Sequence, residues 1–416
     1  MKPDWYNSGL PHIWLPYAQM QTAPHPQAVV STLGSRIKLT DGRELIDGVA
    51  SWWTACHGYN HPHIIKSMQS QLEKMPHVMF GGLVHEPALT LAKRLATLTG
   101  LPRVFFGDSG SVAVEIALKM ALQYWQNKGK PKKDRFLCFH NGYHGDTAGA
   151  MSVSDPDKSL HKAFRNAVIK QYVVDIPTDE YAFAEFDSLL AGFHNTIAAV
   201  IIEPLVQGAG GMIFHSADVL AEIHRICKKH GILFIADEIA TGFGRTGNMF
   251  AVNEAGITPD IMCLGKALTG GAITLGATLA SEEIFASFLS DDTDHAFMHG
   301  PTYMANPLAC AAANASLDLF EKEPRLKQVE AIEAQLREEL EVCSTLPHVV
   351  DVRVKGAIGV VQLEPGVLKK DELRQKFIEH GVWIRPFGDI VYITPAFTIS
   401  PEECSKLCEA IRSVLK

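Results

Sequence analysis

The sequence lacks several features that mark special classes of protein. No uninterrupted apolar run approaches the ~18 residues of a membrane-spanning helix, and the N-terminal stretch has no unbroken apolar core of the secretion-signal type. There is no CxxC pair, because the eight cysteines are scattered along the 416 residues. We therefore expect reduced, mostly buried thiols and a cytoplasmic location.

The chain also has fewer basic than acidic residues. The 38 basic and 46 acidic residues give a formal net charge of -8, which argues against a surface for binding polyanions. We expect neither a nucleic-acid partner nor a membrane partner. The composition, with 47% hydrophobic and 20% charged residues, is typical of a globular enzyme.

The sequence does contain an alternation of short apolar runs and longer amphipathic stretches. The runs are RVFFG (103–107), RFLCFH (135–140), IAAVIIEP (197–204), ILFIADE (232–238) and DIMCLGK (260–266). Such runs are typical of strands buried on both faces of a mostly parallel sheet, and the alternation indicates an α/β fold. We expect helices between them, one from Ser111 and another from Ser216 to a closing Gly231.

A second, smaller α+β domain is expected from the two ends of the chain. Residues 323–343 predict a long charged helix, followed by strand-like and helical stretches, and a hairpin is expected to turn at Asp41-Gly42. We place the large domain at 48–310 and the small one at 1–47 and 311–416.

Three stretches of the α/β region suggest one ligand. In FFGDSGSVAVE a strand ends and a helix begins, so Gly110 and Ser111 could offer free N–H groups and a hydroxyl to a phosphate. An ordinary N-cap turn is the alternative.

The second stretch contains Asp237, directly after a run of apolar residues. A carboxylate at the carboxyl end of a buried strand lies where α/β sheets bind ligands, and it needs a cationic partner. A protonated ring nitrogen of a cofactor would serve. A salt bridge with Arg245, or a helix N-cap, is the alternative.

The third stretch, CLGKALTGG, contains Lys266, just past the end of the next strand. Desolvation there would lower the pKa of the lysine and make its amine nucleophilic toward an aldehyde. A solvated surface lysine is the alternative. An anion-binding turn, a buried carboxylate and a strand-end lysine together fit pyridoxal phosphate (PLP).

These residues resemble the signature of the class III aminotransferases, IADEIATGFGRTG followed by PDIMCLGKALTGG. The resemblance covers nearly the whole chain. It implies fold type I, with a seven-stranded-type sheet between helices, PLP as cofactor, and a homodimer that shares its active sites. The resemblance implies that Lys266 forms the Schiff base and carries protons, and that Asp237 is the partner of the pyridine nitrogen. Gly110 and Ser111 would bind the phosphate, and Tyr143 would lie on the cofactor ring. Gly300, Pro301 and Thr302 would contact cofactor and substrate, with Thr302 reaching the phosphate bound by the neighbouring subunit.

Several further stretches, among them GVASWWTACHGYNHP and GVWIRPFGDIVYITPAF, resemble members that aminate 8-amino-7-oxononanoate with S-adenosylmethionine in biotin biosynthesis. This resemblance implies these two small molecules as substrates. Arg385 is the candidate clamp for the carboxylate of the keto acid. The aromatic candidates for the substrate site are Tyr17, Trp52, Trp53, Tyr143 and Tyr392; for Trp53 a place in the core is the alternative.

One departure concerns the amino donor. Relatives that use glutamate carry an acid after the QG of their EPxQGE motif, whereas EPLVQGAGG has Ala209 there. This weighs against glutamate as the donor. An amine:pyruvate-type aminotransferase, a 2,1-aminomutase and a non-enzymatic PLP-binding homologue remain alternatives.

The histidine clusters HGYNHPH and HNGYHGD suggest metal ligands, but no acid or cysteine stands at a metal spacing. We expect loop or core histidines and no metal.

Overall fold

The computed structural model describes residues 2–157, 160–367 and 369–416. Its contacts divide the chain into two compact units. One consists of Met1–Pro62 and Lys327–Lys416, and the other of His63–Leu326. Both boundaries fall later in the chain than positions 48 and 310. The two units are called the terminal unit and the central unit below.

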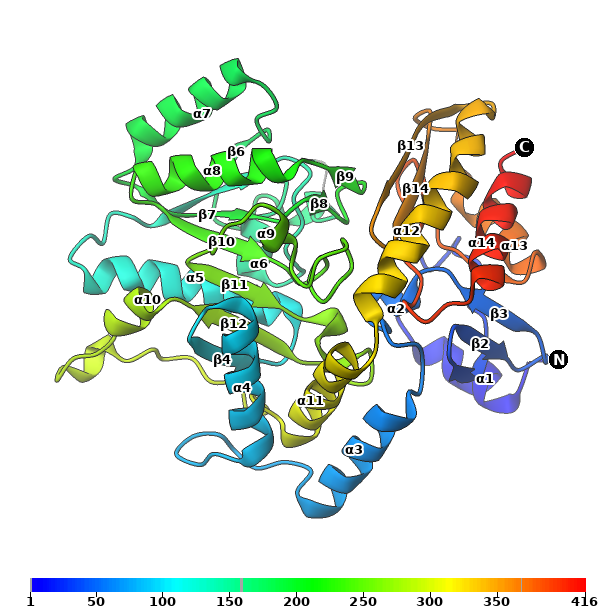
Figure 1. The fold of residues 1–416 in the computed structure, drawn as a ribbon, viewed down its shortest axis with the longest axis horizontal. Helices are drawn as coiled ribbons and strands as arrows, with labels where there is room; N and C mark the ends of the chain where they lie inside the picture. Colours follow the sequence, from blue (N-terminus) through cyan, green and yellow to red (C-terminus); the bar gives the residue numbers. More distant parts are fainter. Residues whose placement is uncertain (1, 158–159, 368) are drawn as a thin grey trace. The chain divides into compact units, whose positions relative to one another are not determined.

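The central unit is built on a seven-stranded sheet (Figure 1) with the order β4-β12-β11-β10-β7-β5-β6. Its strands are β4 (Arg103–Gly107), β5 (Arg135–Phe139), β6 (Tyr172–Val174), β7 (Ile197–Ile202), β10 (Leu233–Asp237), β11 (Ile261–Leu264) and β12 (Gly276–Ala280). Only β12 runs against its neighbours, since it is antiparallel to both β11 and β4. The mostly parallel sheet predicted from the apolar runs is confirmed.

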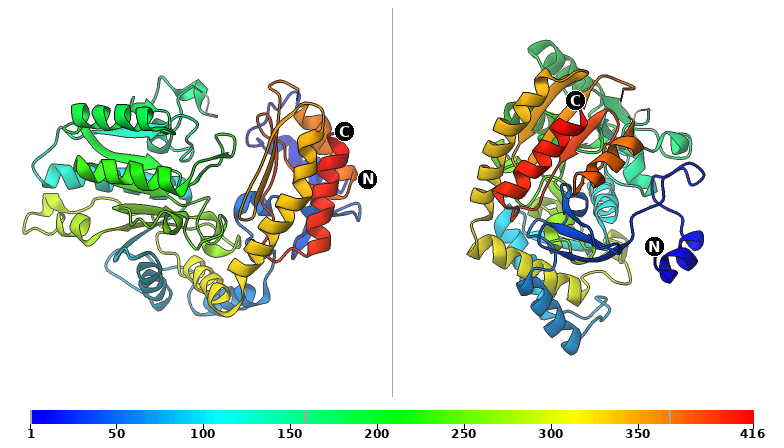
Figure 2. Two further views of the ribbon diagram at one scale, coloured as in Figure 1. Left: turned by 45° about the horizontal axis from the view of Figure 1, so that its top comes forward. Right: turned by 90° about the vertical axis from the view of Figure 1, so that its right-hand side faces the viewer.

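Helices cover both faces of this sheet (Figures 1 and 2). Helix α5 (Gly110–Asn127) shares a core cluster with Ile235 of β10. The ring of Phe234, the preceding residue, lies 5.1 Å from His224 of α8 (Ala217–Lys229). Because adjacent side chains of a strand point to opposite faces, α5 and α8 pack on opposite sides of the sheet.

The remaining helices of the central unit surround this core. They are α3 (Pro62–Lys74), α4 (Glu86–Thr99), α6 (Ala148–Ser152), α7 (Glu180–Phe193), α9 (Ala251–Glu254), α10 (Glu282–Ala286) and α11 (Pro307–Lys322). A two-stranded ribbon joins β8 (Val206–Gln207) to β9 (Ile213–Phe214).

Two predicted helices have the caps that their sequences indicate. The Ser216 side chain accepts the N–H of Val219 at the start of α8, and Gly231 has a φ of 60° just after the helix ends. Helix α5 begins one residue before the predicted Ser111, and Ser109 caps it by accepting the N–H of Val112. The N-cap interpretation of this turn is therefore correct, and it leaves other N–H groups of the first turn for an anion.

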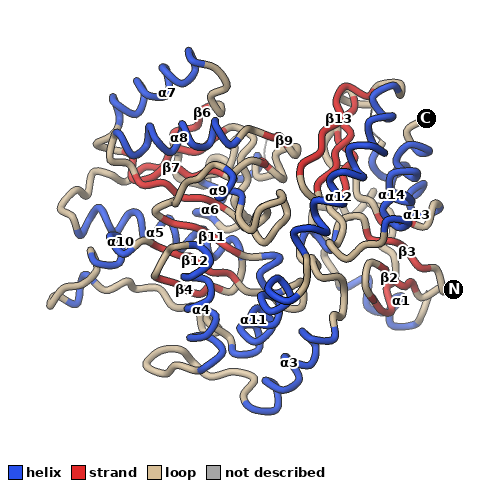
Figure 3. The backbone as a smooth tube through the Cα atoms, in the orientation of Figure 1, coloured by secondary structure: helices blue, strands red, loops and turns tan. Residues whose placement is uncertain are grey.

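The terminal unit contains two sheets, which are coloured as strands in Figure 3. One has the order β1-β2-β3-β15 and the other β13-β14-β16. The strands are β1 (Val29–Leu33), β2 (Arg36–Leu39), β3 (Glu44–Asp47), β13 (Val349–Lys355), β14 (Ile358–Leu363), β15 (Val382–Trp383) and β16 (Ile390–Ile393). The hairpin predicted at Asp41-Gly42 joins β2 to β3, with Gly42 at a φ of 91°.

Helices of the terminal unit are α1 (Asp4–Gly9), the short turn α2 (Ala50–Trp53), α12 (Arg325–Glu341), α13 (Lys370–Glu379) and α14 (Pro401–Val414).

All eight cysteines of the chain are free and buried. Within the described part of the chain, no helix is long and apolar enough to cross a membrane.

Candidate active site

Lys266 and Asp237 lie at the ends of neighbouring parallel strands. Asp237 is the last residue of β10 and pairs in register with Cys263 of β11, three residues before Lys266. Lys266 opens a 3-10 turn with a left-handed φ of 44°. Parallel strands end at the same edge of a sheet, so the lysine and the carboxylate lie at the same edge, where α/β sheets bind ligands.

Partial burial sets the chemistry of Lys266. Desolvation lowers the pKa of its ammonium group, and the negative charges of Asp237 and Glu203 oppose this shift without cancelling it. The backbone before Lys266 lies close to the start of helix α5, since a Cβ at Gly265 would come into ordinary contact, 3.5 Å, with the Cα of Gly110. The lowered pKa raises the neutral fraction of the lysine amine.

The partner of Asp237 is a histidine. The His144 Nδ1 lies 2.7 Å from the Asp237 Oδ2, and both side chains are buried. Burial by itself lowers the pKa of His144, but the hydrogen bond to Asp237 and the charges of Asp237 and Glu203 raise it above its ordinary value. The buried Asp237 carboxylate therefore favours the protonated form of His144.

Glu203 is a second buried carboxylate at the same edge of the sheet, directly after β7. Its oxygens accept the backbone N–H groups of Tyr143 and Gly208, at 2.9 Å each. Burial raises its pKa to about 7. Glu203 thus ties the loop after β5 to the loop after β7.

The predicted anion cup lies at the start of helix α5. Its first turn carries Gly110 and Ser111, and the Ser111 Oγ accepts the N–H of Asp146 at 2.9 Å. A Cβ at Gly145 would clash with Ser111, and one at Gly110 would lie 3.0 Å from Ile239. Backbone therefore approaches closely on both sides of the cup, and the helix start favours a negative ligand.

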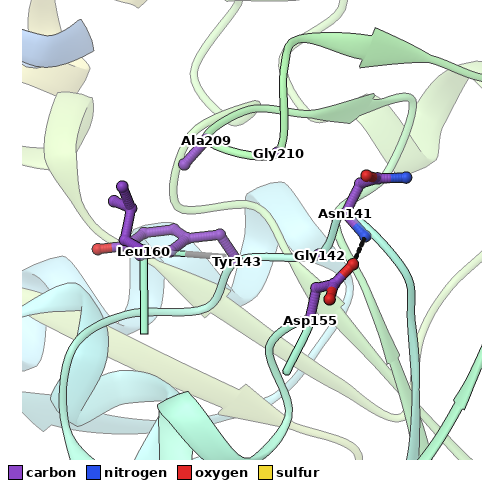
Figure 4. A pocket seen from close by; sticks show the side chains of 7 residues that line it. All are labelled: Asn141, Gly142, Tyr143, Asp155, Leu160, Ala209 and Gly210. Carbon is purple, nitrogen blue, oxygen red and sulfur yellow. Dashed lines mark hydrogen bonds between the residues drawn. The ribbon is translucent and has the colours of Figure 1, made fainter. Parts of the chain in front are cut away.

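Tyr143 lines a pocket together with residues of neighbouring loops (Figure 4). The lining residues are Asn141, Gly142, Tyr143, Asp155, Leu160, Ala209 and Gly210. The Tyr143 hydroxyl donates to the Asp146 Oδ1 at 2.9 Å, and its ring stacks on His161 with centroids 5.5 Å apart. Ala209, which was expected to bear on the choice of amino donor, thus lines the same pocket as Tyr143, the aromatic residue predicted on the cofactor.

Gly210 fixes the distance between two of these loops. A Cβ at Gly210 would clash with the carbonyl oxygen of Asn141. The loop after β7 can therefore pack against the loop after β5 only with glycine at this position.

The residues predicted around Thr302 lie in the loop between the 3-10 turn Thr293–His295 and helix α11. Gly300 and Thr302 are exposed, and Pro301 is partly buried. Their role toward a cofactor or a neighbouring subunit stays a prediction.

In the terminal unit, three of the predicted substrate residues are grouped. The Arg385 guanidinium lies 4.8 Å from the ring centre of Trp52, and the Tyr17 ring meets Trp52 edge-on at 6.0 Å. Burial lowers the pKa of Arg385. Tyr392, on β16, is buried, and burial raises its pKa to about 12. Trp52 is 42% exposed but Trp53 only 5%, so Trp53 occupies the core position left open as its alternative.

An unusual backbone conformation presents Trp52. Four consecutive residues, Ala50 to Trp53, have φ values of 43°, 48°, 57° and 74°. These values belong to the left-handed region, which costs a non-glycine residue about 1–2 kcal/mol. Such a turn persists only where its surroundings stabilise it.

The sequence reasoning missed three residues of the site: His144, Glu203 and Asp146. Glu203 follows a buried apolar run just as Asp237 does, so the same rule would have found it. His144 was considered only as a loop or core histidine. Across the described ranges, no group of three or more histidine, cysteine or acidic residues is arranged to hold a metal ion.

A family model described as Aminotransferase class-III matches residues 17–415. The chain belongs to the class III aminotransferases. It is 47% identical to the adenosylmethionine-8-amino-7-oxononanoate aminotransferase of Buchnera aphidicola subsp. Acyrthosiphon pisum, over 97% of this chain and 96% of the relative. Fold type I and the transaminase activity expected from the sequence are confirmed.

Solved structures agree with this assignment. A crystal structure of the enzyme of that name from Methanocaldococcus jannaschii is similar with a TM-score of 0.95 and 33% identity, over 99% of this chain and 98% of that one. An amine transaminase from an uncultivated Pseudomonas species, solved in a PLP-bound form, has a TM-score of 0.91 and 32% identity, over 97% of this chain and 98% of that one.

The class III aminotransferases depend on PLP, and the residues of the central unit fit this cofactor. The start of α5 suits its phosphate, the Asp237 carboxylate suits a protonated ring nitrogen, and the desolvated Lys266 amine suits its aldehyde.

Proposed function

We propose that this chain transfers the amino group of S-adenosylmethionine to 8-amino-7-oxononanoate and so makes 7,8-diaminononanoate for biotin biosynthesis. The observation that carries the proposal is the end-to-end likeness to a relative named for this reaction, at 47% identity. Lys266 and Asp237 at neighbouring strand ends support the reaction type. Ala209 beside Tyr143, where glutamate-using relatives carry an acid, supports the donor.

When bound, PLP supplies an aldehyde that condenses with amines and a ring that accepts electrons. Lys266 Nζ then acts as the acid and base of the reaction. Its lowered pKa would let the neutral amine accept the proton released from the donor carbon and pass it to the bound cofactor; with the acceptor, it would carry a proton from the cofactor to the acceptor carbon. The Asp237 carboxylate would hold the ring nitrogen of the cofactor, and the hydrogen bond from His144 keeps that carboxylate in place.

The positioning roles follow from the same geometry. We assign Gly110 and Ser111 to the phosphate and Tyr143 to the face of the ring. Tyr143 is held from three directions: by Glu203 at its N–H, by Asp146 at its hydroxyl, and by His161 against its ring. A side chain held in this way loses little further freedom when a ligand binds, which favours binding.

For the acceptor, we assign the far carboxylate to Arg385. A guanidinium binds a carboxylate through two parallel hydrogen bonds, and desolvation strengthens this interaction. Tyr17 and Trp52 offer aromatic faces suited to a sulfonium or an adenine, and Tyr392 lies close enough to Arg385 to be affected by its charge.

The proposal includes a homodimer in the cytoplasm in which Thr302 contacts the phosphate bound by the neighbouring subunit. Gly300 and Pro301 shape the same loop. Light scattering after size-exclusion chromatography would report the mass of the assembly. In the dimer, Thr302→Ala weakens PLP binding; an active monomer would contradict this part of the proposal.

The deciding experiment supplies PLP-loaded protein with S-adenosylmethionine and 8-amino-7-oxononanoate and measures 7,8-diaminononanoate by mass spectrometry. We expect the diamine from wild type and none from Lys266→Ala. Turnover with pyruvate or glutamate but not with this pair would favour an amine transaminase, the activity named for the similar Pseudomonas protein.

A further inference from the structure

The left-handed turn at residues 50–53 requires an explanation, because none of its four residues is glycine. Asp47, at the end of β3, supplies one. Its Oδ1 accepts the N–H of Val49 at 2.8 Å, and its Oδ2 accepts the N–H of Ser51 at 2.9 Å. The Asp47 carboxylate therefore accepts hydrogen bonds from the residue just before the turn and from the second residue of the turn.

Tyr59 completes the arrangement from the other end of the segment. Its hydroxyl donates to the Asp47 Oδ2 at 2.6 Å and lies 2.5 Å from the Ser51 Oγ. Its backbone N–H donates to the carbonyl of Gly34 at 2.7 Å, which fixes it to the loop after β1. Asp47 is 2% exposed, so these hydrogen bonds lie in a desolvated setting, where they are stronger than in water.

The turn gives adjacent tryptophans different surroundings. Trp53 packs into the core of the terminal unit, while Trp52 stays 42% exposed with the Arg385 guanidinium 4.8 Å from its ring. Asp47 and Tyr59 act on the backbone that carries Trp52, through the N–H and the hydroxyl of the preceding residue, Ser51.

We infer that Asp47 and Tyr59 are positioning residues for the substrate: they hold residues 50–53 in the left-handed conformation that places Trp52 against Arg385. The inference rests on the proposed function of Arg385 and Trp52 in acceptor binding. Asp47 and Tyr59 belong to the terminal unit, whereas the residues assigned to the phosphate, the ring and the aldehyde of the cofactor belong to the central unit. Loss of the Tyr59 hydroxyl therefore weakens acceptor binding and leaves PLP binding intact.

Tyr59→Phe is the first test, since it removes the hydroxyl and keeps the ring. We expect the KM for 8-amino-7-oxononanoate to rise about tenfold, as for loss of a hydrogen bond to a charge, with kcat changed less than about twofold. The visible absorbance of bound PLP should be unchanged. An unchanged KM, or a fall in kcat alone, overturns the inference.

A double-mutant cycle tests whether Tyr59 acts through Trp52. Trp52→Ala is expected to raise the same KM, and Tyr59→Phe should then add less than about twofold. An equal effect of Tyr59→Phe in both backgrounds overturns the inference and leaves the proposed function standing. If Trp52→Ala and Arg385→Ala each leave the KM unchanged, their proposed role in acceptor binding fails, and the inference fails with it.

Glycine provides a rescue, because it adopts the left-handed region without the cost paid by other residues. Ser51→Gly, added to Tyr59→Phe, should restore the KM to within about threefold of wild type. His348→Gly is the matched control, since His348 also has a left-handed φ of 64° but lies outside the turn. Recovery with both glycines, or with neither, contradicts the role assigned to the turn.

Discussion

At the scale of single residues, the central unit concentrates buried charge. Asp237 and Glu203 are carboxylates at adjacent strand ends, and His144 lies 2.7 Å from Asp237. Burying such groups is costly unless each finds a partner, and here backbone N–H groups and the imidazole supply partners. We therefore propose that this cluster serves the chemistry at Lys266 rather than stability.

The His144 pair makes a prediction for catalysis. His144→Asn keeps a neutral hydrogen-bond donor but cannot carry a proton beside Asp237. We expect kcat to fall about 10- to 100-fold, the range for a hydrogen bond between charged groups. His140→Asn is the matched control, because His140 lies in the same loop but near Asp155. Equal losses in both variants would indicate damage to the loop instead.

Glu203 makes a prediction for pH. Burial raises its pKa to about 7, so between its ordinary value of 4.5 and about 7 the folded state binds more protons than the unfolded state. Stability from this group is thus full below pH 4.5 and is lost as pH rises through about 7, by at most about 3 kcal/mol.

Urea unfolding of the PLP-free protein at several pH values would measure this dependence. Glu203→Gln should flatten the decline below pH 6.5. The raised pKa of His144, whose contribution is lost only above its ordinary value of 6.5, should leave a decline at higher pH in the variant. The same slope in wild type and variant below pH 6.5 would contradict the assignment.

At the scale of elements, helix starts and left-handed turns place the functional groups. The start of α5 is both a capped helix end and the predicted phosphate cup, because Ser109 satisfies only part of its first turn. In the terminal unit, the turn at 50–53 orients Trp52 through its backbone.

A pair of cap variants separates these roles. Ser109→Ala and Ser216→Ala each remove a side-chain oxygen that caps a helix, α5 and α8 respectively. Each should lower the free energy of unfolding by about 1 kcal/mol. Only Ser109→Ala should also weaken PLP binding, measured by equilibrium titration. Equal PLP affinities in both variants would count against the cup at α5.

These elements were predictable to different degrees. The strands that end at Asp237 and before Lys266 follow from apolar runs, and α8 follows from its helical period with Ser216 and Gly231 at its ends. The left-handed turn could not be predicted, because alanine, serine and tryptophan do not favour that conformation. It depends on Asp47 and Tyr59, whose partnership is a tertiary contact that no local pattern encodes.

At the scale of the whole molecule, the order and direction of the strands follow from membership of the family and not from local patterns in the sequence. Alternating runs predicted a mostly parallel sheet, but neither its order nor the reversed strand β12 follows from them. The boundaries of the two units also lie later in the chain than positions 48 and 310. Helix α12 begins in the central unit and continues in the terminal unit.

The cysteines give a prediction for the molecule as a whole. All eight are buried and free, and burial raises the pKa of Cys138 to about 12. Thiolate is the reactive form, so a thiol reagent such as DTNB should label the native protein slowly and all eight sites rapidly after denaturation. Rapid labelling of the native protein would show that some thiol is accessible.

The contact of Gly210 with the Asn141 carbonyl bears on the engineering of new transaminases from this scaffold. Ala209 lines the pocket, whereas a Cβ at the neighbouring Gly210 would clash with the Asn141 carbonyl. Libraries that aim to change the amino donor should therefore diversify position 209 and keep glycine at 210. Variation at 209 would then alter the lining of the pocket, while Gly210 preserves the packing of the loop after β7 on the loop after β5.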